Sequence, residues 1–158
     1  MRKLLILGLS GLSVALAQSA PDGKLTVAGK SAKVTHVYVY SVEGFFDKKK
    51  DDTVVLLTDR PVTEAQARDG FALRRMAEQG KLAYVQETIN TGGQIVNFTI
   101  GHEAFKAPPS GGSTEHVFEG KLEGRNISGK VRTKGEQQFF GVKYEYEAAF
   151  RAAVQPKK

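Results

Sequence analysis

Apolar and polar side chains alternate along the last long run of the chain, from Val142 to Val154. Every second residue is apolar: Val142, Tyr144, Tyr146, Ala148, Phe150, Ala152 and Val154. Most of the residues between them are charged. A period of two places one set on a buried face and the other in water. The run therefore predicts a half-buried strand of an antiparallel sheet.

A hairpin precedes this strand, formed by residues 114–123 and 126–134 around Gly124-Arg125. Glycine stands first in that turn, as a type II′ turn requires. The register pairs four sets of residues on the inner face: Leu122 with Ile127, Gly120 with Gly129, Phe118 with Val131, and His116 with Thr133. On the outer face it sets Glu119 against Lys130 and Glu115 against Lys134, and such pairs of opposite charge support the register.

A second hairpin is predicted from residues 81–90 and 94–101 around Thr91-Gly92-Gly93. Its inner face includes Val96, Phe98 and Ile100. A two-residue loop directs Val85, Glu87 and Ile89 inward, whereas a three-residue loop directs Leu82 and Tyr84 inward. We favour the two-residue loop.

Three further segments are rich in β-branched or apolar residues and predict strands: 24–28, 33–42 and 53–58. Both faces of 33–42 carry apolar side chains, which indicates a central strand covered on both sides for part of its length. Residues 63–79 predict a helix, with Thr63 and Gln66 as a capping box, Val62 and Ala67 as a hydrophobic staple and Gly80 as the stop. Gly70 weakens its middle by about 1 kcal/mol, so two short helices are the alternative.

About eight strands and one helix in 158 residues predict a mainly β, single-domain fold. We expect an antiparallel β-sandwich over residues 24–154, with one helix near 63–79. A small lipocalin-like or streptavidin-like β-barrel is the alternative. Residues 18–23 are expected to form a flexible lead-in, and residues 155–158 a frayed C-terminal tail.

The N-terminus has the pattern of a bacterial signal peptide. Basic residues in 1–3 precede an apolar stretch, residues 4–16, which is shorter than the ~20 residues of a membrane-spanning helix. The small residues Ala15 and Ala17 predict cleavage after Ala17, leaving a mature chain without a transmembrane segment. We therefore expect residues 1–17 to be removed and the protein to be periplasmic or extracellular.

The composition of the chain excludes several kinds of catalytic and binding site. The chain has no cysteine, so it has neither disulfides nor thiol catalysis. Removing Arg2 and Lys3 from the net charge of +6 leaves +4, spread among nearly as many acids, and we expect no nucleic-acid partner. No Gly-x-Ser-x-Gly motif or phosphate-binding glycine loop is present.

The candidate ligand-binding residues centre on His116, which the hairpin register turns toward the core. The other candidates are Tyr38, Tyr40, Tyr84, His36 and Glu87. The spacing of His36, His102 and His116 matches no metal motif, so we expect no metal and no cofactor. A candidate interaction surface lies in the loops, with Phe45, Phe46 and Phe105.

These patterns favour an exported binding or envelope-interaction module without catalytic activity. Its partner would be an unidentified protein or small molecule, and exposed edge strands would allow a homodimer. The alternative is a periplasmic carrier of a small apolar ligand held in a barrel or sandwich pocket. A third hypothesis is a hydrolase, which requires an acid and a histidine that converge in a cleft.

Overall fold

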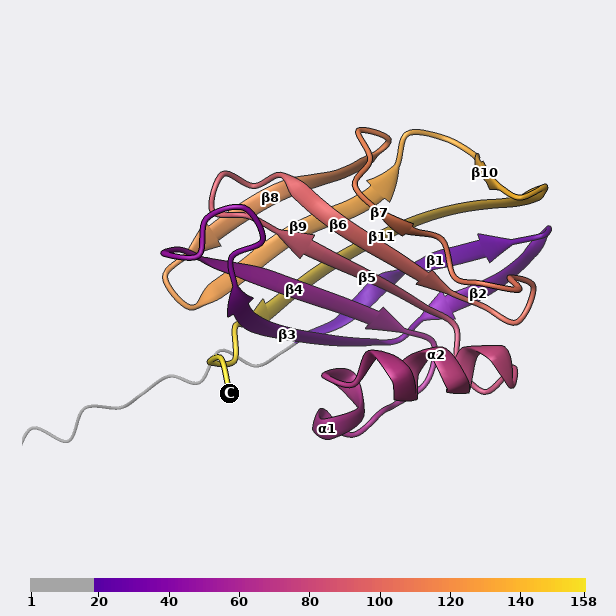
Figure 1. Ribbon diagram of the computed structural model, residues 1–158, viewed down its shortest axis with the longest axis horizontal. Helices are drawn as coiled ribbons and strands as arrows, with labels where there is room; N and C mark the ends of the chain where they lie inside the picture. The colour runs from indigo at the N-terminus through magenta and orange to yellow at the C-terminus, as the bar shows by residue number, and fades with distance from the viewer. Residues whose placement is uncertain (1–18) are drawn as a thin grey trace, which may run out of the picture.

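Two antiparallel sheets pack face to face in the computed structural model, which describes residues 19–158 (Figure 1). One sheet has the order β2-β1-β11-β9-β8, with β10 also paired to β11, and we call it sheet A. The other, sheet B, has the order β3-β4-β5-β6-β7. The expectation of a mainly β antiparallel sandwich is confirmed, and the described chain does not close into the alternative barrel.

The described chain contains eleven strands and two helices. Sheet A comprises β1 (Ser19–Val27), β2 (Lys30–Val34), β8 (His116–Glu123), β9 (Asn126–Thr133), β10 (Gln137–Phe139) and β11 (Val142–Ala153). Sheet B comprises β3 (His36–Glu43), β4 (Asp51–Thr58), β5 (Tyr84–Ile89), β6 (Ile95–Gly101) and β7 (Ser110–Gly111). The helices are α1 (Glu64–Ala67) and α2 (Gly70–Glu78). The strands beyond the expected eight are the short β2, β7 and β10, which carry too few residues to show a period.

The C-terminal third of the chain folds as its pattern predicts. On β11 the alternate residues Tyr144, Tyr146, Ala148, Phe150 and Ala152 are buried in the core between the sheets. The predicted register of the β8–β9 hairpin is confirmed at every inner pair, from Leu122 opposite Ile127 to His116 opposite Thr133. Gly124 has φ +60°, which only glycine adopts freely at the first turn position.

The favoured two-residue loop of the β5–β6 hairpin was wrong, because the Asn90 N–H donates to the Gln94 carbonyl at 2.9 Å and closes a three-residue loop over residues 91–93. The residues of β5 that the two-residue loop directed inward, Val85, Glu87 and Ile89, nevertheless face the core. A bulge opposite Thr88 and Ile89 inserts one extra residue into β6, so Ile89 pairs with Ile95. Ile95 therefore packs against the core in place of Val96, and the inward prediction for Val96 was wrong.

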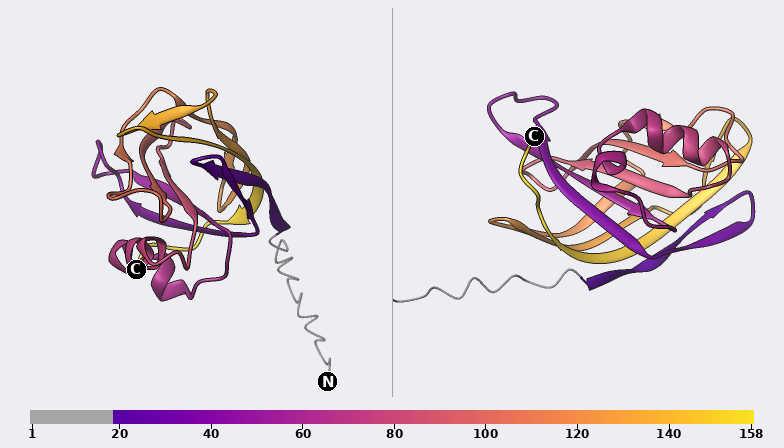
Figure 2. Two further views of the ribbon diagram at one scale, coloured as in Figure 1. Left: turned by 90° about the vertical axis from the view of Figure 1, so that its right-hand side faces the viewer. Right: turned by 90° about the horizontal axis from the view of Figure 1, so that it is seen from below.

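The helices form a third layer on the outer face of sheet B (Figure 2). The predicted capping box at Thr63 and Gln66 is present, but α1 ends at Ala67. Asp69 then caps α2 by accepting from the N–H groups of Phe71 and Ala72. The segment 63–79 therefore forms two helices rather than one, because a second N-cap stands in its middle.

The β3 strand is an edge strand, not the central strand that its composition indicated. Both of its faces are nevertheless covered, one by the core and one by the helices. Its free edge is covered by the C-terminus: the Ser41 N–H donates to the Gln155 carbonyl, and the Gln155 N–H donates to the Val39 carbonyl, each at 2.9 Å. Lys157 also pairs with Asp51 at 2.8 Å.

Both predicted tails are therefore corrected where the structure describes them. Residues 155–158 do not fray, because they are held by backbone hydrogen bonds and ion pairs. Residues 19–23 belong to β1, which pairs with β11 from Ser19 onward. The expected signal peptide, residues 1–17, lies outside the described residues. Within residues 19–158, no helix is long and apolar enough to cross a bilayer.

Candidate functional site

A network of polar side chains crosses the core between the two sheets. Glu87 projects from β5 of sheet B, while His116 on β8 and Tyr144 and Tyr146 on β11 project from sheet A. The Tyr146 hydroxyl donates to Glu87 Oε1 and lies 2.9 Å from His116 Nδ1. His116 Nδ1 is 3.5 Å from Glu87 Oε1, and His116 Nε2 is 3.1 Å from the Tyr144 hydroxyl. We call these four residues the cross-sheet network.

Strand register explains why these side chains meet. His116 lies opposite Thr133, whose hydroxyl accepts from the Tyr146 N–H at 3.3 Å, so His116 and Tyr146 occupy one row of sheet A. Glu87 lies between Val55 and Phe98 in the inner row of sheet B. The Phe98 ring stacks on the His116 ring with centroids 3.8 Å apart. The facing rows therefore bring one acid and one imidazole together inside an apolar core.

Burial controls the proton affinity of this network. Removal from water raises the pKa of Glu87, against the lowering effect of its hydrogen bonds with His116 and Tyr146. Burial, followed by the adjacent carboxyl, raises the pKa of Tyr146 well above its ordinary value. Glu87 Oε2 is buried and has no hydrogen-bond partner. The network thus favours a neutral Glu87 and keeps Tyr146 as a hydrogen-bond donor.

The network does contain an acid and a histidine in contact, as the hydrolase hypothesis requires. However, His116 is only 4% exposed, and both of its ring nitrogens face tyrosine hydroxyls. A general base needs a free nitrogen within reach of the proton that it abstracts. The geometry is therefore that of a buried hydrogen-bond network that links the two sheets.

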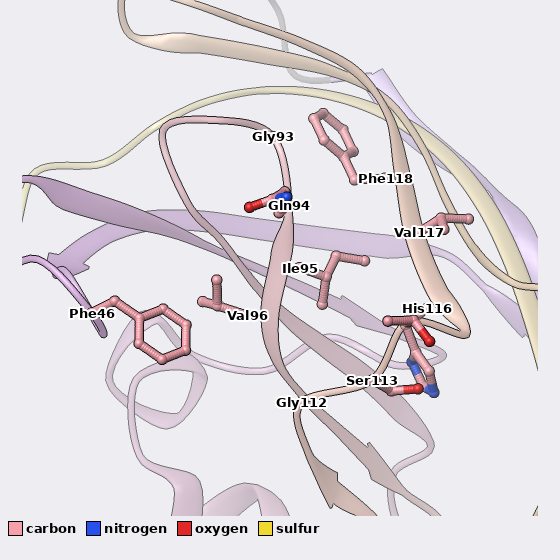
Figure 3. Close-up of a pocket in the computed structure, with 11 residues that line it drawn as sticks. Phe46, Gly93, Gln94, Ile95, Val96, Gly112, Ser113, His116, Val117 and Phe118 are labelled. Atoms are coloured by element: carbon pink, nitrogen blue, oxygen red, sulfur yellow. The ribbon is translucent and has the colours of Figure 1, made fainter.

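An open groove lies beside this network, where the edge of sheet A faces the start of β6 (Figure 3). Its volume is about 820 Å³. Figure 3 shows Val96 projecting toward Phe46 on one side and Ile95 toward His116 on the other. The lining residues are Phe46, Gly93, Gln94, Ile95, Val96, Gly112, Ser113, Thr114, His116, Val117 and Phe118. We call this feature the lateral groove.

The lateral groove is apolar and carries no charged side chain. Its lining residues include no lysine, arginine, aspartate or glutamate, and the His116 ring is held within the network. Phe46 is 78% exposed, and its ring meets that of Phe45, which is 57% exposed, in an edge-to-face contact. The predicted interaction residues Phe45 and Phe46 are therefore on the surface, and Phe46 forms one wall of the groove.

The other predicted site residues lie elsewhere. Tyr38, Tyr40 and Tyr84 are on the outer face of sheet B, beneath the helices. Their roles there are structural: the Tyr38 hydroxyl accepts from the Val62 N–H, the Tyr40 hydroxyl donates to the Ala67 carbonyl, and burial raises the pKa of Tyr84 to about 12. They do not line a pocket with His116.

His36 and Phe105 are also remote from the groove. His36 bonds the neighbouring Thr35 hydroxyl at 2.8 Å. Phe105 is buried against Phe139 and Tyr144, so it is not part of an exposed interaction surface. Within residues 19–158, no three His, Cys, Asp or Glu side chains are grouped to hold a metal ion.

Sequence reasoning found Glu87 and His116 but missed their two tyrosine partners. Tyr144 and Tyr146 had been placed correctly on the inner face of β11, yet only the packing of the two sheets shows which inner side chains meet. The groove was missed because it depends on the bulge that turns Val96 away from the core.

No family model, curated protein or solved structure matches this chain. The fold and the site define a two-sheet antiparallel β-sandwich with a polar cross-sheet tie and a lateral apolar groove. Its function is therefore inferred from geometry and chemistry alone.

Proposed function

We propose that this protein is an exported binding module without catalytic activity, and that its lateral groove takes an uncharged, apolar small molecule. The observation that carries the proposal is the lining of the groove, in which apolar side chains from three separate segments converge without a lysine, arginine, aspartate or glutamate. A charged ligand would lose its hydration there without gaining a partner of opposite charge.

The size of the groove supports a small molecule. Ligand sites commonly have volumes of about 300–1,000 Å³ and apolar walls with a few polar groups. The lateral groove, at about 820 Å³, falls within that range. Its polar groups are Gln94, Ser113 and Thr114, which are suited to hold one hydroxyl or carbonyl of a mostly apolar ligand.

The cross-sheet network supports a role in binding rather than in catalysis. The imidazole that borders the groove is already bound at both nitrogens, and the acid beside it lies deeper in the core. In this proposal His116 forms part of the floor beneath the ligand, and the network fixes the spacing of the two sheets on either side of the groove.

The experiment that tests this function is a titration with N-phenyl-1-naphthylamine, an uncharged fluorescent probe. We expect saturable binding with a stoichiometry of one. The double variant Phe46→Ser/Val96→Asp should weaken binding at least tenfold, because it removes a ring wall worth about 1.5–3 kcal/mol when fully buried and adds a carboxylate to the groove.

The matched control is Phe140→Ser. Phe140 is 92% exposed and does not line the groove, so this variant should bind the probe with unchanged affinity. Equal weakening by both variants, or non-saturable uptake by the unaltered protein, would contradict the proposal. Binding of only a macromolecular partner by the Phe45 and Phe46 surface would instead favour an envelope-interaction role.

Export is a separate part of the proposal and rests on the N-terminal sequence pattern. It is tested by producing the full chain in a bacterial host and sequencing the N-terminus of protein released from the periplasm. We expect a mature chain that begins at Gln18. A cytoplasmic product that retains Met1 would contradict export without affecting the groove.

A further inference from the structure

The β8 strand is the one long sheet edge in the described chain that nothing covers. It ends the strand order of sheet A and runs for eight residues (Figure 1). The opposite edge, β2, is five residues long and carries Lys30 and Lys33. In sheet B, β3 is covered by Gln155, and the two-residue β7 follows Pro108 and Pro109. Proline and covering segments are among the usual protections of sheet edges, and β8 has neither. It does carry Glu119, Lys121 and Glu123, so its length and its uncovered backbone, rather than a lack of charge, distinguish it from β2.

The hydrogen-bond pattern of the hairpin shows which backbone groups of β8 are free. The Lys134 N–H donates to the Glu115 carbonyl at 2.8 Å, so odd-numbered residues direct their backbone groups toward β9. The two-residue turn after Glu123 gives the same parity, because the pair that closes such a turn is hydrogen-bonded. The outward-facing backbone groups therefore belong to the even-numbered residues: His116, Phe118, Gly120 and Leu122.

We propose that two copies of this chain associate through β8, antiparallel, with the two-fold axis at Gly120. In that register Gly120 faces the partner's Gly120, and Phe118 faces the partner's Leu122. All of these residues direct their backbone groups outward, so the strands form about six hydrogen bonds and join two copies of sheet A into one continuous sheet.

The side chains of β8 are complementary to themselves in the same register. On the solvent face, Glu119 comes opposite the partner's Lys121, and the symmetry repeats this opposite-charge pair. The Glu119 carboxylate also accepts from Arg132 in its own sheet through Oε1, so the partner's Lys121 would be a second cation beside it. On the inner face, Phe118 and Leu122 are each only partly buried by their own core, so each covers the remaining exposed surface of the other. The charged pairs and the apolar contacts therefore both favour the two-fold axis at Gly120.

Neighbouring registers fit less well. An axis at Leu122 carries the partner strand past the turn residues Gly124 and Arg125, where the backbone no longer extends the edge. An axis at Phe118 carries it past the start of the strand at His116. Axes at Glu119 and Gly120 give the same overlap of seven residues of β8. An axis at Glu119 places Glu119 opposite the partner's Glu119, so the charges favour the axis at Gly120.

Because the chain contains no cysteine, cross-linking of mature protein tests this register directly. Glu119→Cys and Lys121→Cys proteins are prepared separately and oxidised with oxidised glutathione, alone and mixed. Opposed positions 119 and 121 have Cα atoms about 4.5–5.5 Å apart, within disulfide reach. Position 119 lies about 8 Å from the partner's position 119, beyond that reach.

We expect disulfide-linked dimers when the Glu119→Cys and Lys121→Cys proteins are mixed, and little disulfide-linked dimer when either protein is oxidised alone. Sedimentation velocity of the unaltered protein should show a concentration-dependent dimer. Lys121→Glu should weaken it about tenfold by placing like charges opposite each other, and Glu119→Lys/Lys121→Glu should restore it. Lys143→Glu, a charge reversal on β11, serves as the control and should have no effect.

A protein that stays monomeric at high concentration, or cross-linking of either variant with itself as readily as in the mixture, would overturn the proposal. So would a dimer that Lys121→Glu leaves unchanged. The dimer interface and the lateral groove share the β8 edge, because His116, Val117 and Phe118 line the groove. None of these variants alters a residue that lines the groove, so loss of the dimer and loss of probe binding are measured separately.

Discussion

The cross-sheet network makes a quantitative prediction for Tyr146→Phe. The substitution removes one oxygen and leaves the ring, so it creates almost no cavity. That oxygen donates the hydrogen bond to Glu87 Oε1 and lies 2.9 Å from His116 Nδ1. Glu87 Oε2 has no partner, so the carboxyl would keep only the 3.5 Å contact with His116.

The expected cost follows from the burial of the groups left behind. An unsatisfied buried polar group costs about 1–3 kcal/mol, and a hydrogen bond between neutral groups contributes about 0.5–1.5 kcal/mol. We therefore expect Tyr146→Phe to lower the free energy of unfolding by about 2–3 kcal/mol. Tyr144→Phe, which removes a single contact with His116 Nε2, should lower it by about 1 kcal/mol.

The assay is urea denaturation at pH 7 followed by circular dichroism, because the chain has no tryptophan. A double-mutant cycle of Tyr146→Phe with Glu87→Gln should give a coupling free energy above about 0.5 kcal/mol. A loss below about 0.5 kcal/mol for Tyr146→Phe, with no coupling to Glu87, would refute the view that this hydroxyl ties the two sheets together.

Three further predictions concern stability. Burial raises the pKa of Glu87 above its unfolded value of 4.5, so its contribution to stability is fully present below pH 4.5 and is lost as the pH rises through the folded-state pKa. As the pH rises through this range, Glu87→Gln should therefore become more stable relative to the unaltered protein. Parallel pH profiles of the two proteins in urea titrations would contradict this. Gly120→Ala should cost about 1–3 kcal/mol by thermal unfolding, because a Cβ there would lie 2.3 Å from the Ser128 carbonyl oxygen and 2.7 Å from the Phe118 ring. Gly70→Ala is the comparison, since a Cβ there meets no atom within 4 Å and the backbone does not have a positive φ. Deleting residues 155–158 should increase amide hydrogen exchange of Ser41 on β3, whose N–H donates to the Gln155 carbonyl, while leaving β9 protected. Unchanged exchange of Ser41 would show that the C-terminal pairing is not stabilising.

Sequence periodicity predicted the parts of this fold in which one face is solvated. The alternation on β11 and the turn at Gly124 fixed a register that the structure reproduces residue by residue. The same reasoning failed on residues 33–42, because apolar side chains cover both faces of β3 and a period of two does not distinguish an edge strand from a central one. Tyr38 and Tyr40, predicted to bind a ligand together with His116, lie instead on the outer face of sheet B beneath the helices.

Two of the four residues of the cross-sheet network could be predicted from the sequence. Glu87 and His116 were recognised as polar residues on inward-facing positions, which is a local property of each hairpin. Their convergence with Tyr144 and Tyr146 depends on how sheet A packs on sheet B, and no local pattern encodes that distance. The groove depends on a single inserted residue near Val96, and short-range alternation gives no warning of a bulge.

The first and last strands of the described chain are neighbours: β1 pairs with β11 along most of its length, and β11 in turn joins β1 to β9. Residues separated by more than a hundred positions must therefore meet before sheet A exists. Sheet A cannot be completed until β11 has left the ribosome, so this domain cannot reach its native state while only its N-terminal part has been released.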